Sequence, residues 1–317
     1  MLRRTLFQGA AAALVGSAAV HVAPSRADAV PKTAFVLVHG SWHAGWCWGL
    51  VSPKLHAAGM HSVALDLPGH GLNAVLPQSY QRRPLDPAAF ATEPSALAGV
   101  GIHSYADAVV EAARTARAMG AQRVFAVAHS MGGVPATFAA AKAPDAFTGL
   151  IYLAALLPTP HKPAGAYLAL EDQHANSLIG QVIMADPAVV GALRIDPRSV
   201  DSTYLAGAKE AVAADVDDTL WSAALNMLTP DAPVSIYGDE ATFDPAFGRL
   251  QRTYIRATKD RTLVPSTCEA IVADLNSAWP DHPTALVDID TSHEPMLAQP
   301  DRLAELVIAA AEGAPLR

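Results

Sequence analysis

A serine at the end of an apolar strand is the residue best placed to do chemistry. Ser130 follows the apolar run 123–128, and the small residues Ala128 and Gly132 flank it two positions away on each side, a variant of the G-x-S-x-G pattern. Small residues are needed where a strand turns sharply into a helix and strains the serine backbone. The pattern predicts an exposed nucleophilic hydroxyl at a helix N-terminus. The plainer interpretation is a serine that caps an ordinary helix.

A base and an acid follow at the ends of two later strands. A serine hydroxyl becomes an effective nucleophile when a histidine takes its proton and a carboxylate orients that histidine. Asp260 follows the β-branched and aromatic run 252–257, and His293 follows the run 284–289. We predict a triad of Ser130, Asp260 and His293, because catalytic groups gather at the carboxyl ends of parallel strands. The other aspartates considered for the acid role are Asp239, Asp288 and Asp290.

The sequence after the first apolar strand predicts a turn whose backbone N–H groups can stabilise a developing negative charge. Gly40 and Ser41 follow the run 34–38, and the glycine allows the backbone to turn and present the Ser41 N–H. The Met131 N–H, directly after the candidate nucleophile, is the second donor. Each such donor stabilises an oxyanion by about 3 to 4 kcal/mol. The alternative is that the first segment is a simple strand-exit turn.

The chain resembles the α/β-hydrolases, within a branch that contains plant hydroxynitrile lyases, plant methyl esterases and bacterial carboxylesterases, including pyrethroid hydrolases. The order Ser…Asp…His is the order of that family. The resemblance covers nearly all of the chain after its N-terminal segment and implies a serine esterase without a cofactor. The motifs that carry it, besides the Asp260 and His293 loops, are His39-Gly40-x-x-His43-x-Gly45-Trp46-x-Trp48, Asp66-Leu67-Pro68-Gly69-His70-Gly71 and His129-Ser130-Met131-Gly132-Gly133.

Two positions separate this chain from the lyases of that branch. The lyases have a threonine where this chain has Gly40, and a lysine that handles cyanide where it has Glu294. A carboxylate repels cyanide and cannot replace a cationic group. We therefore expect hydrolysis of a carboxylic ester through an acyl-enzyme. A lyase or haloperoxidase-like use of the same triad, or a non-catalytic ligand-binding homologue, remains the alternative.

Alternating strand and helix patterns predict an α/β fold with about six mostly parallel strands flanked by helices. We assign residues 30–155 and 233–317 to the α/β-hydrolase core and 156–232 to a helical lid or cap, because that segment is too long for a simple connection. The expected strands are 34–38, 61–65, 123–128, 149–154, 252–257 and 284–289. The expected helices are 46–58, 104–119, 131–142, 265–277 and 300–312.

The cap is rich in apolar residues, which favours an ester of apolar or aromatic character. A second insertion, 73–102, looks like a long surface loop, and its Arg82 and Arg83 are more simply solvated than bound to an acidic substrate group. The residues expected to contact the substrate are Trp42, His43, Leu156, Trp221 and Leu225. Further apolar cap residues that either line a pocket or pack the cap are Leu157, Tyr167, Leu168, Leu178, Ile179, Ile183, Met184 and Met227.

The N-terminus resembles a twin-arginine export signal. Arg3 and Arg4 precede an apolar, alanine-rich stretch, and Ala27-Asp28-Ala29 offers a cleavage site. The stretch is short and interrupted for a membrane span, so residues 1–29 predict export to the periplasm or medium, without stable membrane insertion after removal.

The amino-acid composition of the chain limits the classes of partner that it is expected to bind. The 317 residues are 51% hydrophobic and 16% charged, with a formal net charge of −8. An acidic chain without a basic stripe argues against nucleic-acid binding, and no Cys and His spacing suggests a metal site. A small-molecule ester is the expected partner, and the oligomeric state is left open. Cys47 and Cys268 either pair or lie apart as buried thiols, and the second is preferred.

Overall fold

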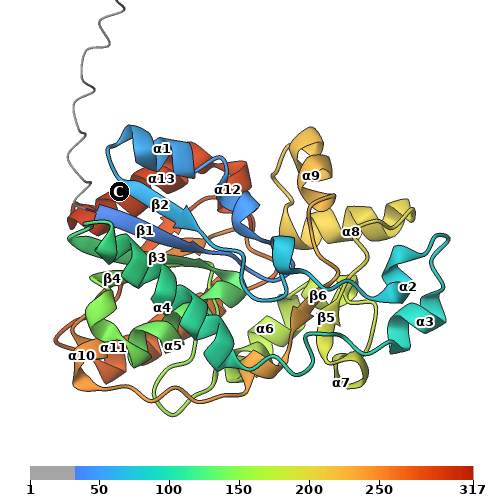
Figure 1. Cartoon of the computed structure of the whole chain (residues 1–317), viewed down its shortest axis with the longest axis horizontal. Coiled ribbons are helices and arrows are strands. Elements are labelled where there is room, and N and C mark those ends of the chain that lie inside the picture. Colours follow the sequence, from blue (N-terminus) through green and yellow to red (C-terminus); the bar gives the residue numbers. More distant parts are fainter. Residues whose placement is uncertain (1–32, 317) are drawn as a thin grey trace, which may run out of the picture. The chain divides into compact units, whose positions relative to one another are not determined.

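The computed structural model describes residues 33–316, whose centre is a six-stranded parallel sheet in the order β2-β1-β3-β4-β7-β8 (Figure 1). This confirms the predicted sheet, with strand ends displaced by at most a residue or so. The predicted signal peptide, residues 1–29, lies outside the described residues. The strands of the sheet are β1 (Thr33–Val38), β2 (His61–Ala64), β3 (Arg123–His129), β4 (Gly149–Leu153), β7 (Gln251–Ala257) and β8 (Ala285–Ile289).

The register of the central strands brings the predicted site loops together. β1 and β4 are buried along their whole length, as is typical of parallel strands covered by helices on both faces. Val38 at the end of β1 is paired with Ala128 of β3, so the turn after β1 and the turn after β3 begin at the same level. Ala257 at the end of β7 is paired with Ile289 of β8, which aligns the loops that carry Asp260 and His293.

Helices cover both faces of the sheet. α1 (Ser52–Ala57) and α13 (Pro300–Glu312) lie together on one face, and α4 (Ile102–Ala118) and α5 (Gly133–Lys142) pack against each other on the other (Figure 1). α4 buries residues at three- and four-residue spacing, as an amphipathic helix does. The remaining helices are α2 (Gln78–Gln81), α3 (Pro87–Thr92), α6 (Glu171–Asn176), α7 (Pro187–Val190), α8 (Ser202–Val212), α9 (Asp218–Leu225), α10 (Pro245–Gly248), α11 (Pro265–Ala278) and α12 (Pro295–Ala298).

The prediction of one helix over 46–58 is wrong. The segment forms a short 3₁₀ helix, Gly45–Trp48, followed by a separate α1 with Pro53 in its first turn. A proline has no N–H to donate and its ring clashes with the carbonyl four residues earlier, so it begins a helix more readily than it continues one.

The 73–102 segment is also more ordered than the predicted surface loop. It contains α2 and α3, and it buries Tyr80 and Phe90, whose rings stack 5.9 Å apart. Arg82 is exposed, as expected for a solvated charge. Arg83, in contrast, donates to Asp196 of the cap at 2.9 Å, so it is neither freely solvated nor aimed at a substrate.

A buried arginine of the cap links the cap to this second insertion. In the cap, β5 (Ala192–Arg194) pairs with β6 (Asp231–Pro233), so the predicted boundary at residue 232 falls within a strand. Arg194 is fully buried, bonds Asp231 with two nitrogens at 2.7 and 2.8 Å, and donates to the Phe90 carbonyl at 2.6 Å. Such bidentate pairing fixes geometry as well as charge, and it ties the strand pair to α3.

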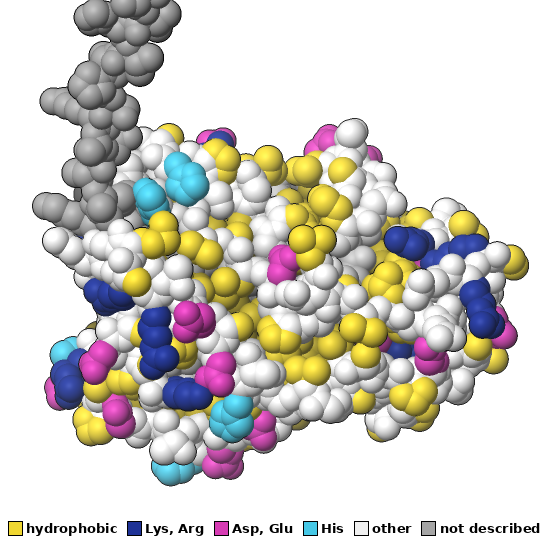
Figure 2. Space-filling model, in the orientation of Figure 1, with side chains coloured by type: hydrophobic (Ala, Val, Ile, Leu, Met, Phe, Trp, Pro, Cys, Tyr) yellow, Lys and Arg dark blue, Asp and Glu magenta, His cyan; other side chains and the backbone are white. Residues whose placement is uncertain are grey.

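The surface of the described part mixes charges of both signs. In the view of Figure 2, acidic and basic side chains are interspersed over the region of α4, α5 and α10, and hydrophobic side chains are exposed between that region and the cap. Among residues 33–316, no helix combines the length and apolar character needed to cross a membrane.

Candidate active site

Ser130, His293 and Asp260 form a continuous hydrogen-bonded series. His293 Nε2 lies 2.9 Å from Ser130 Oγ, and His293 Nδ1 lies 2.6 Å from Asp260 Oδ2. His293 and Asp260 are buried, whereas Ser130 is partly exposed to the cavity above it. The structure therefore brings the three residues together in the order that activates a serine hydroxyl.

The strained backbone of Ser130 explains the small residues around it. Ser130 has φ +52°, a left-handed conformation that costs a non-glycine residue free energy. A Cβ at Gly132 would lie 2.5 Å from the His39 carbonyl oxygen, and one at Gly40 would lie 2.8 Å from the Ser130 Cβ. The turn after β3 and the turn after β1 are thus too close for larger residues, and the threonine found in the lyases has no room at Gly40 without movement.

The geometry also separates the four candidate acids. Asp260 Oδ1 accepts from the Thr262 and Leu263 amides at 2.7 and 3.0 Å, which leaves Oδ2 for His293. Asp239, Asp288 and Asp290 are exposed, the latter two paired with Arg256 and Lys259 respectively. Of the four, only Asp260 contacts the histidine.

The electrostatics of His293 favour a protonated intermediate. Burial lowers the pKa of His293, but the charge and hydrogen bond of Asp260 outweigh burial, with a smaller contribution from Glu294, and the net result is a raised pKa. His129 Nε2 donates to the His293 carbonyl at 2.9 Å and so supports the loop. Burial, followed by the charges of His293 and His43, holds the pKa of His129 well below its ordinary value, which keeps that ring neutral.

A second histidine fixes the turn that carries Ser41. His39 Nε2 accepts from the Leu67 N–H at 3.1 Å, so its Nδ1 carries the proton and donates to the Gly40 carbonyl at 2.8 Å. Because a trans peptide points its N–H away from its C=O, this bond aims the Ser41 N–H away from His39. Ser41 and Met131 both line the cavity that contains Ser130.

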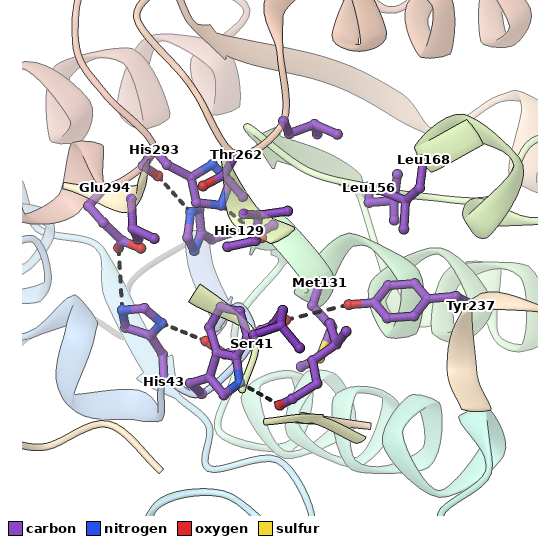
Figure 3. A pocket seen from close by; sticks show the side chains of 17 residues that line it. Ser41, His43, His129, Met131, Leu156, Leu168, Tyr237, Thr262, His293 and Glu294 are labelled. Atoms are coloured by element: carbon purple, nitrogen blue, oxygen red, sulfur yellow. Dashed lines mark hydrogen bonds and ion pairs between the residues drawn. The ribbon is translucent and has the colours of Figure 1, made fainter. Parts of the chain in front are cut away.

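The cavity above Ser130 has a volume of about 130 Å³ and mostly apolar walls (Figure 3). Trp42, His43 and Leu156 line it, as predicted. Residues from the cap close it from above, which places part of the predicted lid next to the triad. The other apolar residues that line it are Leu168, Ile179, Ile183, Leu193, Val212 and Leu263.

Two residues predicted to contact substrate lie elsewhere. Trp221 and Leu225 of α9 line a separate, smaller cavity of about 20 Å³ behind Trp42, His43 and Val212. The inner face of α9 therefore packs the cap and does not reach Ser130. The two cysteines are both free and buried, so the prediction of separate thiols is confirmed.

Two polar residues at the cavity were not predicted as site residues. The Tyr237 hydroxyl lies 3.4 Å from Ser41 Oγ. Glu294, which the sequence marks only as a difference from the lyases, lies beside His43. Tyr237 stands in a segment without strand or helix periodicity, so no sequence signal pointed to it. The position of Glu294 directly after His293 was the available signal.

Comparison with known proteins identifies the family to which the chain belongs. A family model described as the alpha/beta hydrolase family matches residues 35–306. The chain belongs to the alpha/beta hydrolase family. Its relatives include Methylesterase 9 of Arabidopsis thaliana, 22% identical over 292 residues that span 89% of this chain and 99% of the relative. Pheophorbidase of Raphanus sativus is 25% identical over 280 residues, covering 85% of this chain and 90% of the relative.

A solved structure shares the fold of this alpha/beta hydrolase. The crystal structure of a pyrethroid hydrolase from Sphingobium faniae JZ-2 superposes with a TM-score of 0.66 at 23% identity, covering 88% of this chain and 97% of that one. At that identity, the similarity establishes the fold alone. The names of the esterase-type relatives support hydrolase activity.

Proposed function

We propose that this alpha/beta hydrolase is a serine carboxylesterase that cleaves an ester of apolar or aromatic character through an acyl-enzyme. The observation that carries the proposal is the series Asp260–His293–Ser130, with contacts of 2.6 and 2.9 Å, beneath an apolar cavity. The names of its relatives, methylesterase, pheophorbidase and pyrethroid hydrolase, support ester chemistry.

In the first step, Ser130 Oγ attacks the ester carbonyl carbon while His293 Nε2 takes the hydroxyl proton. Asp260 holds His293 in the tautomer with Nδ1 protonated and stabilises the imidazolium. The Ser41 and Met131 amides stabilise the oxyanion. His293 then gives its proton to the leaving alkoxide, which departs as the alcohol and leaves an ester bond between the acyl group and Ser130.

In the second step, water attacks the acyl carbon of that bond. His293 again takes a proton, now from the water, and returns it to Ser130 Oγ as the acid leaves. The apolar wall formed by Leu156, Leu168, Ile179 and Ile183 suits an aliphatic or aromatic acyl or alcohol group.

Hydrolysis of short p-nitrophenyl esters by the wild type and Ser130→Ala tests this proposal. We expect the variant to lose activity by a factor of about 10⁴ or more, because triad members act as a unit, while its unfolding temperature stays close to that of the wild type. Retention of wild-type turnover by Ser130→Ala would refute the assignment of the nucleophile.

We further propose that the enzyme is exported. The support is the Arg3-Arg4 pair followed by an apolar stretch and Ala27-Asp28-Ala29. Fractionation of cells that express the full chain should place the processed enzyme outside the cytoplasm, and replacement of both arginines by lysine should retain the unprocessed chain inside. Equal export of the two forms would contradict a twin-arginine signal.

A further inference from the structure

Glu294 is a buried carboxyl group without a hydrogen bond. It directly follows His293, is fully buried, and neither of its side-chain oxygens has a hydrogen-bond partner. It occupies the N-cap position of α12, but its side chain does not cap that helix. Buried acidic groups are normally hydrogen-bonded, so a lone one beside a candidate triad calls for a functional explanation.

His43 lies beside this carboxyl group. Glu294 Oε2 lies 3.5 Å from His43 Nε2, which is also buried and without a hydrogen bond. The other ring nitrogen, Nδ1, lies 2.8 Å from the Ser41 carbonyl oxygen. A carbonyl can only accept, so Nδ1 carries a proton and Nε2 faces the carboxyl. Figure 3 shows this series of contacts running from Glu294 through His43 to Ser41.

The surroundings of Glu294 favour the protonated form of its carboxyl group. A carboxylate facing a neutral imidazole would leave a buried charge without compensation. Burial raises the pKa of Glu294, and although His43 and His293 oppose that effect, the net pKa remains above the ordinary value. The ionisable groups around the pair supply no permanent positive charge. They are His293 and Asp260 of the triad, His129 directly before Ser130, His39 and His70 near His43, and Cys47 of the 3₁₀ helix.

The turn that this pair supports has a strained backbone. Trp42, directly after Ser41, has φ +62°. The cap holds Trp42, since the indole N–H donates to the Leu193 carbonyl at 2.8 Å and the Trp42 carbonyl accepts from the Thr229 N–H at 2.9 Å. His43 holds the Ser41 carbonyl from the core side, and Glu294 stands behind His43. The two supports together fix the peptides on either side of Trp42, directly after Ser41.

We propose that Glu294 is a positioning residue for the turn after β1: acting through His43, it holds the Ser41–Trp42 peptide, and with it the adjoining Ser41 N–H, in the orientation that stabilises the transition state. This role rests on the proposed esterase function. Under this proposal, the residue directly after the triad histidine has a different role from the lysine found at that position in the lyases. The raised pKa of Glu294 also makes the support sensitive to pH, because loss of its proton as the pH rises leaves a buried negative charge near the oxyanion.

Two substitutions separate positioning from simple packing. Glu294→Leu fills similar space but leaves His43 Nε2 without a carboxyl group beside it. We therefore expect kcat to fall about 10- to 100-fold, part of the effect of losing an oxyanion donor, with KM changed less than about threefold. Glu294→Gln keeps an N–H that can donate to His43 but cannot ionise. It should keep kcat within about fivefold of the wild type near neutral pH and lack the wild-type decline at alkaline pH.

The experiment measures kcat and KM for p-nitrophenyl butyrate across pH, and the rate at which a fluorophosphonate labels Ser130, for the wild type and both variants. Glu312→Leu, which removes an exposed carboxylate at the end of α13, is the matched control and should behave as the wild type. Thermal unfolding checks that the variants fold. If Glu294→Leu does not fold, the pH profile of Glu294→Gln decides.

Wild-type kcat and labelling rate in a folded Glu294→Leu would overturn the role of Glu294 and leave the esterase proposal standing. So would a Glu294→Gln variant that is as slow as Glu294→Leu or that keeps the alkaline decline. A wild type that is neither active on esters nor labelled at Ser130 would refute the proposed function and this role with it.

Discussion

Replacing Asp260 by asparagine should disable the site through the tautomer of one histidine. Asp260 Oδ1 accepts from the Thr262 and Leu263 amides at 2.7 and 3.0 Å, and Oδ2 bonds His293 Nδ1 at 2.6 Å. In Asp260→Asn, the amide oxygen must stay with the two backbone donors, so the NH₂ group faces His293. Nδ1 then becomes an acceptor and the proton moves to Nε2, which can no longer accept the Ser130 proton.

The expected loss in kcat is about 10³- to 10⁴-fold, or roughly 4 to 5.5 kcal/mol at 1.36 kcal/mol per factor of ten. The acid limb of the pH profile should also move. The pKa of His293 is raised in the wild type, so activity should rise with pH through a value above the ordinary histidine range. Asp260→Asn removes the charge that raises the pKa of His293, so the acid limb of the pH profile should shift to lower pH.

The assay is the pH dependence of kcat/KM on a p-nitrophenyl ester for the wild type, Asp260→Asn and Asp288→Asn. Asp288 is a matched control, because it lies near the end of β8, the strand before the His293 loop, but bonds Arg256 at 2.8 and 2.9 Å on the surface. We expect Asp288→Asn to stay within about twofold of the wild type. Equal losses for both variants, or a fully active Asp260→Asn, would refute the reasoning.

Two further predictions concern stability. Gly132→Ala places a Cβ 2.5 Å from the His39 carbonyl oxygen, so it should lower the free energy of unfolding by about 2 to 3 kcal/mol and also reduce kcat. Gly99→Ala is the control, because its Cβ meets nothing within 4 Å and should change neither quantity. Equal melting temperatures of the two variants in calorimetry would contradict this prediction. Burial and then the charge of His43 lower the pKa of His70 to about 4. The contribution of His70 to the free energy of unfolding is therefore complete above about pH 6.5. It declines by up to roughly 3 kcal/mol as the pH falls to about 4, because the unfolded chain takes up the proton first. Urea unfolding should show a shallower decline for His70→Gln than for the wild type, and identical pH dependence would argue against a buried neutral His70.

The sequence was sufficient to predict that Ser130, Asp260 and His293 lie together, because each of them follows a strand whose local pattern is clear. Ser130 ends an apolar run, and the carboxyl ends of parallel strands meet at one edge of the sheet, so order along the chain implied proximity. The choice of Asp260 over Asp288 came from the same argument, and it agrees with their burial in the structure.

The features that escaped prediction depend on contacts between segments far apart in the chain. The partner of Glu294 is on the turn after β1, and the partner of Arg194 is Asp231 on a two-strand ladder with no hairpin signal. The position of Trp221 depends on the rotation of α9 against the cap, which apolar content alone does not specify. The helix α3 was the exception, because Asp86 and Pro87 form an N-cap and first-turn pattern that local reasoning could have used.

The central claim, that Ser130 is the nucleophile of an acyl transfer, is tested most directly by the mass of the enzyme after treatment with a fluorophosphonate. The account predicts one added phosphonyl group, mapped by peptide sequencing to Ser130, with loss of esterase activity in proportion to labelling and no label on Ser130→Ala. An unlabelled but active enzyme, or a label on another residue that accounts for the loss of activity, would contradict it.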